Sequence, residues 1–172
     1  SAVLMSQGQI LGVVPKRYLP NYSEFYEMRH FTAGEPAMGS IRIGELTVPF
    51  GMNLLLECQT MPQLVVAAEI CEDLWAPAPP SQSHALAGAT VIMNLSASDE
   101  MIGKAAYRRE LVTGQSARLY CGYIYADAGE GESTTDMVYA GHNLIAESGS
   151  LLAESKLFRH GLTITELDIQ KI

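Results

Sequence analysis

A nearly unbroken apolar run, LVVAAEI at residues 64–70, most constrains what the chain can fold into. A short run that is rich in Val and Ile and apolar on both sides is typical of a strand buried on both faces. Similar runs, bounded by Gly, Pro, Asn or Asp, recur at residues 9–14, 46–50, 90–95 and 122–126. The sequence therefore predicts a sheet of buried strands.

Segments of helical character separate these runs, and the pattern changes near the C-terminus. Helices are expected at residues 23–29, 81–87 and 104–119, with a short turn near residues 53–56. MVYAGHNLIAESGSLLAES consists of two alternating runs joined by a Ser-Gly turn, and a further strand is expected at residues 162–169. Buried strands, connecting helices and an antiparallel tail together predict a layered α/β protein with a mixed sheet.

Composition narrows the class of protein and its partners. The 172 residues suit one folded domain, with 48% hydrophobic and 17% charged side chains. The net charge is −8 and there is no basic run, so nucleic acid is not an expected partner. No apolar run reaches the roughly 20 residues of a membrane helix, so no membrane contact is expected. Three cysteines without CxxC spacing argue against a disulfide framework or a zinc site and favour a reducing cytoplasm.

Cys71 ends the apolar run and is followed at once by two carboxylates, Glu72 and Asp73. A cysteine at the end of a buried strand can be a rigidly held nucleophile, or it can be a buried structural thiol. None of the four histidines offers an obvious pairing with it, so a papain-like Cys-His site is not favoured. The other candidate cation is Lys16, which closes the run at residues 9–14, although a lone lysine is more often a solvated surface residue.

Several segments together extend these observations over nearly the whole chain. PKRYLPNYSEFYEMRHFTAG contains Lys16, EICEDLWAPAPPS contains Cys71, and LAGATVIMNLSAS, YIYADAGEGESTTD and GHNLIAESGSLLAES follow in order. They resemble the signature blocks of the nitrilase, or carbon-nitrogen hydrolase, superfamily, and most closely the glutaminase domain of glutamine-dependent NAD synthetases. The resemblance implies the α-β-β-α sandwich of that superfamily with mixed sheets. Residues 1–172 would be a partial domain that lacks its N-terminal strands and helix, because the chain enters a strand at once without a starting methionine.

The resemblance also implies catalytic roles. Cys71 would attack the side-chain amide carbon of glutamine, form a thioester and release ammonia, and water would then hydrolyse the thioester to glutamate. Lys16 and the backbone N–H of Glu72 would stabilise the oxyanion. Glu27 resembles a supporting carboxylate that orients Lys16, whereas the general-base glutamate of the family lies upstream of the lysine block, outside this sequence. The residues implied in substrate binding are Tyr22, Glu72, Ser98, Lys104, Trp75 and Phe25.

Each of these residues also has an ordinary structural interpretation. Ser98 can be a turn serine, Tyr22 and Trp75 can be packing aromatics, and Glu27 can be a glutamate on a helix surface. Lys104 stands where an arginine is expected in the family, which would replace a bidentate clamp by a point charge. GEGESTTD lacks the lysine and the strand-loop-helix context of a phosphate-binding loop, and we interpret it as a structural loop.

The function implied is glutamine amide hydrolysis that supplies ammonia to an ATP-dependent NAD synthetase domain, which converts deamido-NAD to NAD. The implied partners are L-glutamine, a synthetase domain in the same full-length chain, and further copies in a homo-oligomer. ATP and Mg are expected only in the synthetase domain, with no metal or cofactor in this one. One alternative is another carbon-nitrogen hydrolase, such as an ω-amidase or a carbamoylase. A second alternative is a structural fragment that is inactive because the general-base glutamate is absent.

Overall fold

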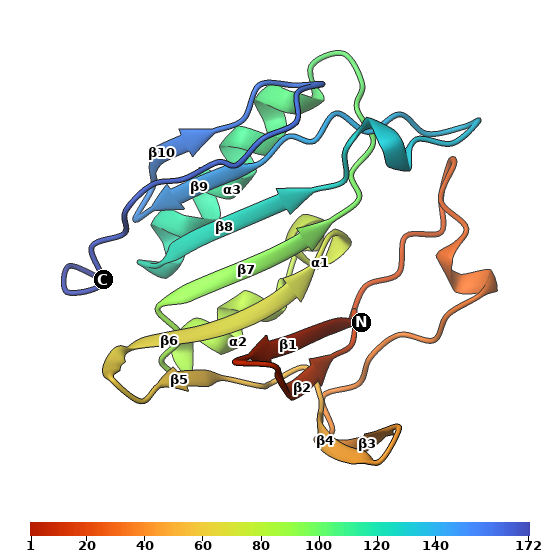
Figure 1. The fold of residues 1–172 in the computed structure, drawn as a ribbon. Coiled ribbons are helices and arrows are strands. Elements are labelled where there is room, and N and C mark those ends of the chain that lie inside the picture. Colours follow the sequence, from red (N-terminus) through yellow and green to blue (C-terminus); the bar gives the residue numbers. More distant parts are fainter.

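The computed structural model describes residues 1–172 and contains two mixed sheets and three short or medium-length α-helices (Figure 1). The larger sheet has the order β10-β9-β8-β7-β6-β5, and the smaller has the order β1-β2-β4-β3. The strands of the larger sheet are β5 (Leu56–Cys58), β6 (Met61–Ile70), β7 (Val91–Ser96), β8 (Gly122–Asp127), β9 (Leu144–Glu147) and β10 (Ser150–Glu154). Those of the smaller sheet are β1 (Ala2–Ser6), β2 (Gln9–Val14), β3 (Gly39–Ile43) and β4 (Leu46–Phe50). The helices are α1 (Glu72–Trp75), α2 (Pro80–Leu86) and α3 (Lys104–Leu119), with 3-10 turns η1 (Glu27–Arg29) and η2 (Glu130–Glu132).

Three parallel strands, β6, β7 and β8, form the centre of the larger sheet, and antiparallel strands flank them. The connection from β6 to β7 carries α1 and α2, and the connection from β7 to β8 carries α3. Parallel strands joined in this way end at the same edge of their sheet, which is where α/β proteins commonly bind ligands. The carboxyl ends of β6, β7 and β8 therefore lie next to one another.

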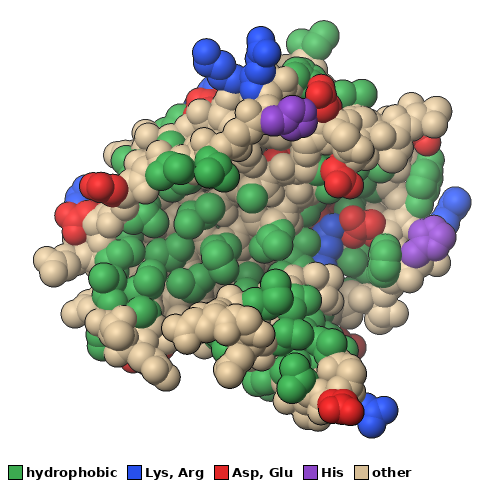
Figure 2. Space-filling model, viewed as in Figure 1, with side chains coloured by type: hydrophobic (Ala, Val, Ile, Leu, Met, Phe, Trp, Pro, Cys, Tyr) green, Lys and Arg blue, Asp and Glu red, His purple; other side chains and the backbone are tan.

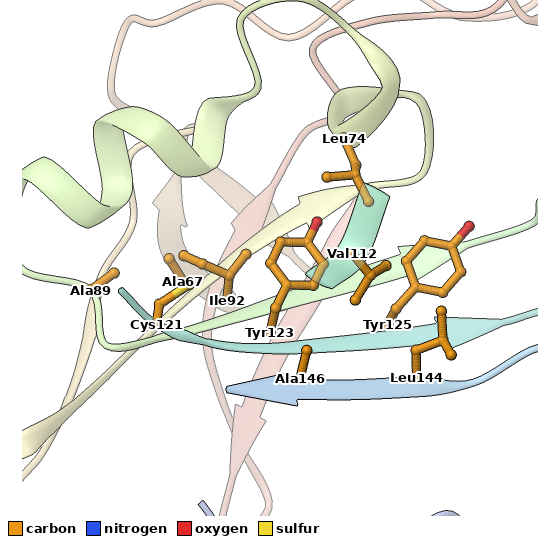
Figure 3. Packing of buried hydrophobic residues seen from close by; sticks show 10 residues of the cluster. All are labelled: Ala67, Leu74, Ala89, Ile92, Val112, Cys121, Tyr123, Tyr125, Leu144 and Ala146. Atoms are coloured by element: carbon orange, nitrogen blue, oxygen red, sulfur yellow. The ribbon is translucent and has the colours of Figure 1, made fainter. Parts of the chain in front are cut away.

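The two faces of β6 pack against different layers, which explains why its sequence is apolar on both sides. Ala67 belongs to a buried cluster between the sheet and the helices, together with Tyr123 and Leu144 (Figure 3). The next residue, Ala68, belongs to a second cluster on the opposite face, where Leu4 of the smaller sheet packs. The order of layers is thus helices, larger sheet and smaller sheet.

The smaller sheet covers only part of its face of the larger one. Figure 2 shows hydrophobic side chains gathered over this side of the molecule. Leu95, Leu162 and Ile164 keep 44%, 89% and 78% of their surface exposed. No helix in the structure combines the length and apolar character that crossing a membrane would require.

The buried strands and the C-terminal hairpin agree with the sequence prediction, whereas two predicted elements were wrong. Residues 23–29 do not form a helix, because Ser23 has a φ of 52° and only the turn at Glu27–Arg29 follows. Residues 162–169 do not form a strand, because the segment makes no ladder with β10 or any other strand. The predicted turn near residues 53–56 lies just before β5. The strands β1, β3 and β5 were not predicted from the sequence.

One carboxylate lies inside the core between the sheet and the helices. Glu69 of β6 is 1% exposed and accepts hydrogen bonds from the Ser81 backbone N–H at 2.8 Å and from the Tyr123 hydroxyl. Burial raises the pKa of Glu69 to about 7, although both hydrogen bonds oppose the shift. The folded state therefore holds a proton on Glu69 at pH values where the unfolded chain has already lost it.

This difference predicts how stability depends on pH. Between an ordinary glutamate pKa of 4.5 and about 7, the folded state binds more protons, so Glu69 lowers the free energy of unfolding as pH rises. The loss should be on the order of 3 kcal/mol across this window. Urea titrations from pH 5 to pH 8 should show this decline, and Glu69→Gln should reduce it. A smaller decline should remain, because burial also raises the pKa of Asp127 to about 6. The exposed-site variant Glu110→Gln should keep the full decline, and parallel pH profiles for wild type and Glu69→Gln would contradict the assignment.

Candidate active site

Cys71 lies between the end of β6 and the start of α1, at the edge where the parallel strands end. Its backbone has φ 46° and ψ −102°, a conformation that non-glycine residues rarely adopt. The Cys71 N–H points to two acceptors on β7, the Leu95 carbonyl oxygen and Asn94 Oδ1, each at 3.1 Å. The sequence thus forms a tight elbow that is held by the neighbouring strand.

A pocket of about 610 Å³ opens at this edge of the sheet. Its lining includes Cys71 and Lys16, Glu27 from η1, and Ser96 and Asp127 from the ends of β7 and β8. The segment that follows β2 passes this edge before it returns to β3 (Figure 1). The topology therefore brings the two blocks singled out in the sequence to one cavity.

Lys16 is held by a carboxylate inside this pocket. Its Nζ donates hydrogen bonds to both carboxylate oxygens of Glu27, at 2.7 and 2.6 Å, and only 10% of its side chain is exposed. The pair fixes the ammonium group at the pocket wall while the remaining N–H can point elsewhere. Lys16 is thus not a solvated surface lysine.

Asp73 joins the lysine and cysteine segments. Its Oδ1 accepts the backbone N–H groups of Arg17 at 3.0 Å and Tyr18 at 2.8 Å, and its Oδ2 accepts that of Ile70 at 2.9 Å. Burial raises the pKa of Asp73, and the three N–H donors oppose this shift. One carboxylate thus ties residues directly after Lys16 to residues directly before Cys71.

The environment of Cys71 favours a protonated thiol at neutral pH. Burial raises its pKa, while the charge of Lys16 and a hydrogen bond from Ser96 oppose that effect. A thiol is a much weaker nucleophile than a thiolate. Chemistry at Cys71 therefore requires a group that accepts its proton when it attacks.

The predicted substrate-binding residues form a group beside the pocket rather than part of its lining. The Tyr22 hydroxyl donates to Glu72 at 3.0 Å, and burial together with this carboxylate raises the pKa of Tyr22 to about 12. Phe25 packs edge-on against Tyr22, with ring centroids 5.8 Å apart. Lys104 pairs with Asp99, and its Nζ lies 5.4 Å from the ring centroid of Trp75.

Ser98 is buried behind this group. It is 3% exposed, its Oγ accepts a hydrogen bond from Arg108 at 3.1 Å, and its N–H donates to Asp127 at 2.8 Å. Arg108 is itself fully buried and also donates to Glu100 at 2.9 Å. In this conformation Ser98 supports the loop that carries Asp99.

Sequence reasoning overlooked three residues that shape the site: Asp73, Asn94 and Ser96. Asp73 was noted only as a flanking carboxylate, although an acidic residue just after a strand end is a common acceptor for backbone N–H groups. Asn94 and Ser96 are polar residues in the apolar run of β7, which was the available signal for them. The GEGESTTD loop reaches the pocket through Glu132. No group of three or more His, Cys, Asp or Glu side chains is arranged to hold a metal ion.

Known proteins resemble this chain in sequence and in fold. The glutamine-dependent NAD(+) synthetase of Mycobacterium bovis is 50% identical over 169 residues, which cover 98% of this chain and 25% of that protein. The crystal structure of a glutamine-dependent NAD(+) synthetase from Cytophaga hutchinsonii superposes with a TM-score of 0.75 at 33% identity, over 88% of this chain and 24% of that one. Nearly the whole chain is thus similar, in sequence and in fold, to one part of these synthetases.

The chain spans about a quarter of the length of the curated synthetases that it matches. A carbon-nitrogen hydrolase from Helicobacter pylori superposes with a TM-score of 0.69 at 18% identity, over 95% of this chain and 54% of that one, and so shares the fold. No protein-family model matches the chain. The predicted mixed-sheet fold of the superfamily is confirmed.

The pocket geometry predicts how Lys16 affects the reactivity of Cys71. Lys16→Met removes the positive charge that lowers the pKa of Cys71, so alkylation by iodoacetamide should slow several-fold at pH 8 and its midpoint should move to higher pH. Mass spectrometry of the Cys71 peptide measures this rate. Lys156→Met, at an exposed site, is the matched control and should react like wild type. Equal alkylation profiles for wild type and Lys16→Met would show that the two groups do not interact.

Proposed function

We propose that Cys71 hydrolyses the side-chain amide of glutamine and that the ammonia serves an NAD synthetase domain of the same full-length protein. The observation that carries this proposal is the shared pocket of Cys71 and Lys16, whose ammonium is fixed by Glu27. A cysteine at a rigid elbow beside a held cation suits amide hydrolysis through a thioester. The similar proteins are glutamine-dependent NAD(+) synthetases, and for this reason we propose glutamine as the nitrogen donor.

The proposed reaction proceeds in two steps. Cys71 Sγ bonds to the amide carbon, the C–N bond breaks, and the nitrogen leaves as ammonia after it takes up a proton. Water then attacks the thioester, which releases glutamate and restores the thiol. In both steps Lys16 Nζ and the backbone N–H of Glu72 would donate hydrogen bonds to the oxyanion.

Proton transfer in this reaction needs a base, because burial raises the pKa of the Cys71 thiol. Glu27 is engaged with Lys16 through both oxygens and suits the supporting role. We assign the base to the glutamate that the family carries upstream of its lysine block, outside these 172 residues. The thiol would lose its proton to that carboxylate as it attacks, and the carboxylate would return the proton to the leaving nitrogen.

Recognition of the glutamine headgroup is assigned to the group beside the pocket. Glu72, which the Tyr22 hydroxyl orients, would accept the α-ammonium, and Lys104 would contact the α-carboxylate. Lys104 is paired with Asp99, so the substrate carboxylate would compete with that contact. Ser98, Trp75 and Phe25 would complete the walls, as the family resemblance implies.

The wider assignments follow from the family and are proposed with it. Residues 1–172 would be part of a glutaminase domain, and ATP and Mg would bind only in the synthetase domain. The full-length protein would form a homo-oligomer. Three free cysteines, Cys58, Cys71 and Cys121, suit the reducing cytoplasm.

The test compares two nitrogen sources in the full-length protein that carries this chain. Cys71→Ala should lower glutamine-dependent NAD formation by at least about three powers of ten, because the nucleophile is lost, and should leave ammonia-dependent formation near wild type. Both rates are measured by the appearance of NAD. Cys58→Ala is the matched control and should keep both activities. Equal loss of both rates in Cys71→Ala, or wild-type glutamine use by that variant, would overturn the proposal.

A further inference from the structure

A continuous chain of buried side chains leads from α2 to the backbone of Cys71. The Ser81 N–H donates to Glu69, which also accepts the Tyr123 hydroxyl hydrogen. The Tyr123 oxygen accepts Asn94 Nδ2–H at 3.1 Å, and Asn94 Oδ1 accepts the Cys71 N–H at 3.1 Å. The chain crosses β6, β7 and β8 on the face that packs against the helices.

Every side chain in this chain is removed from solvent. Glu69 and Asn94 are each 1% exposed, and Tyr123 is fully buried within the apolar cluster. Figure 3 shows the Tyr123 hydroxyl on the side of the sheet where Leu74 of α1 lies. Burying polar groups among apolar residues costs free energy unless each is hydrogen-bonded, and apolar residues of similar size would avoid this cost. Packing alone therefore does not explain these polar side chains.

The hydrogen bonds fix the orientation of the Asn94 amide. When Glu69 is ionised, the Tyr123 hydroxyl hydrogen is directed to it, so Asn94 Nδ2 must donate to the Tyr123 oxygen and Asn94 Oδ1 faces the N–H of Cys71. Reversing the amide would place an N–H group against the N–H of Cys71. The orientation of Asn94 thus depends on the two residues behind it.

The backbone of Cys71 needs such a restraint. Its φ of 46° and ψ of −102° correspond to a conformation that persists only when the surroundings hold it. Asn94 Oδ1 and the Leu95 carbonyl oxygen are the two acceptors of its N–H, and both belong to β7. Loss of Asn94 would leave one acceptor, and the elbow would be free to relax.

We propose that Asn94 is a positioning residue that holds the Cys71 elbow, and that Tyr123 and Glu69 keep Asn94 in its orientation. The inference rests on the proposed function in one respect, namely that Cys71 is the reacting nucleophile. The elbow sets both the direction of Cys71 Sγ and the direction of the N–H of Glu72, the second oxyanion donor in the proposed function. A misplacement of about 1 Å can cost about 100-fold in rate.

The test uses the full-length protein and three variants. Asn94→Leu keeps the approximate size and removes the acceptor, and Tyr123→Phe removes the support for Asn94 without changing the ring. The matched control is Thr90→Val, because the Thr90 hydroxyl, directly before β7, also bonds to the backbone of β6, at the far end of the strands from Cys71. Each variant is checked for cooperative thermal unfolding. The measurements are kcat and KM for glutamine hydrolysis and the rate of Cys71 alkylation by iodoacetamide, which requires no glutamine.

The expected result separates positioning from folding. Asn94→Leu should lower kcat about 10- to 100-fold with KM changed less than about threefold, and it should also change the alkylation rate of Cys71. Tyr123→Phe should shift both quantities in the same direction by a smaller factor, and Thr90→Val should match wild type. If Asn94→Leu does not fold, Tyr123→Phe decides the question.

Two outcomes would overturn the inference. One is a folded Asn94→Leu, or a folded Tyr123→Phe in its place, with wild-type kcat and a wild-type alkylation rate. The other is a Thr90→Val variant that loses as much activity as Asn94→Leu. If wild type hydrolyses no glutamine but Asn94→Leu still changes Cys71 alkylation, the proposed function fails and the positioning role stands.

Discussion

The carboxylate of Asp73 is the contact on which the site depends. It accepts three backbone N–H groups, two from Arg17 and Tyr18 and one from Ile70, and so joins segments that lie 55 and 56 residues apart in the sequence. Lys16 directly precedes the first of these segments, and Cys71 directly follows the second. If this contact were broken, the backbone N–H groups and the Asp73 carboxylate would be left buried without hydrogen-bond partners. Breaking it would therefore cost free energy. The shared pocket of Lys16 and Cys71 follows from this one side chain.

The larger sheet positions the other residues of the site. Because β6, β7 and β8 are parallel, the elbow at Cys71, the pocket residue Ser96 and the carboxylate Asp127 arrive at one edge. The same three strands carry polar groups toward the helices, where Asn94 reaches back to the elbow. The nucleophile is therefore held on one side by its own segment and on the other by the neighbouring strand, which is how a strained backbone can persist.

Much of the fold could be predicted from sequence because it depends on local patterns. Apolar runs on both faces predicted β6, β7 and β8, and a Ser-Gly turn between alternating runs predicted the pairing of β9 with β10. The helix expected at residues 23–29 and the strand expected at residues 162–169 failed, because positive φ at Ser23 and the lack of a pairing partner are properties of the tertiary structure. Family blocks pointed to Lys16 and Cys71. They could not reveal the contact of Asp73 or the orientation of Asn94, because both depend on residues distant in sequence.

The central claim is that Lys16 stabilises the oxygen of an acyl group carried by Cys71, and a crystal structure of a trapped adduct tests it most directly. The full-length protein is treated with an electrophilic glutamine analogue that leaves a ketone on the thiol. The account predicts an adduct on Cys71 Sγ, with the ketone oxygen about 2.7 to 3.2 Å from Lys16 Nζ and within the same range of the Glu72 backbone nitrogen. An adduct at Cys58 or Cys121, or a ketone oxygen that faces away from Lys16, would contradict the account.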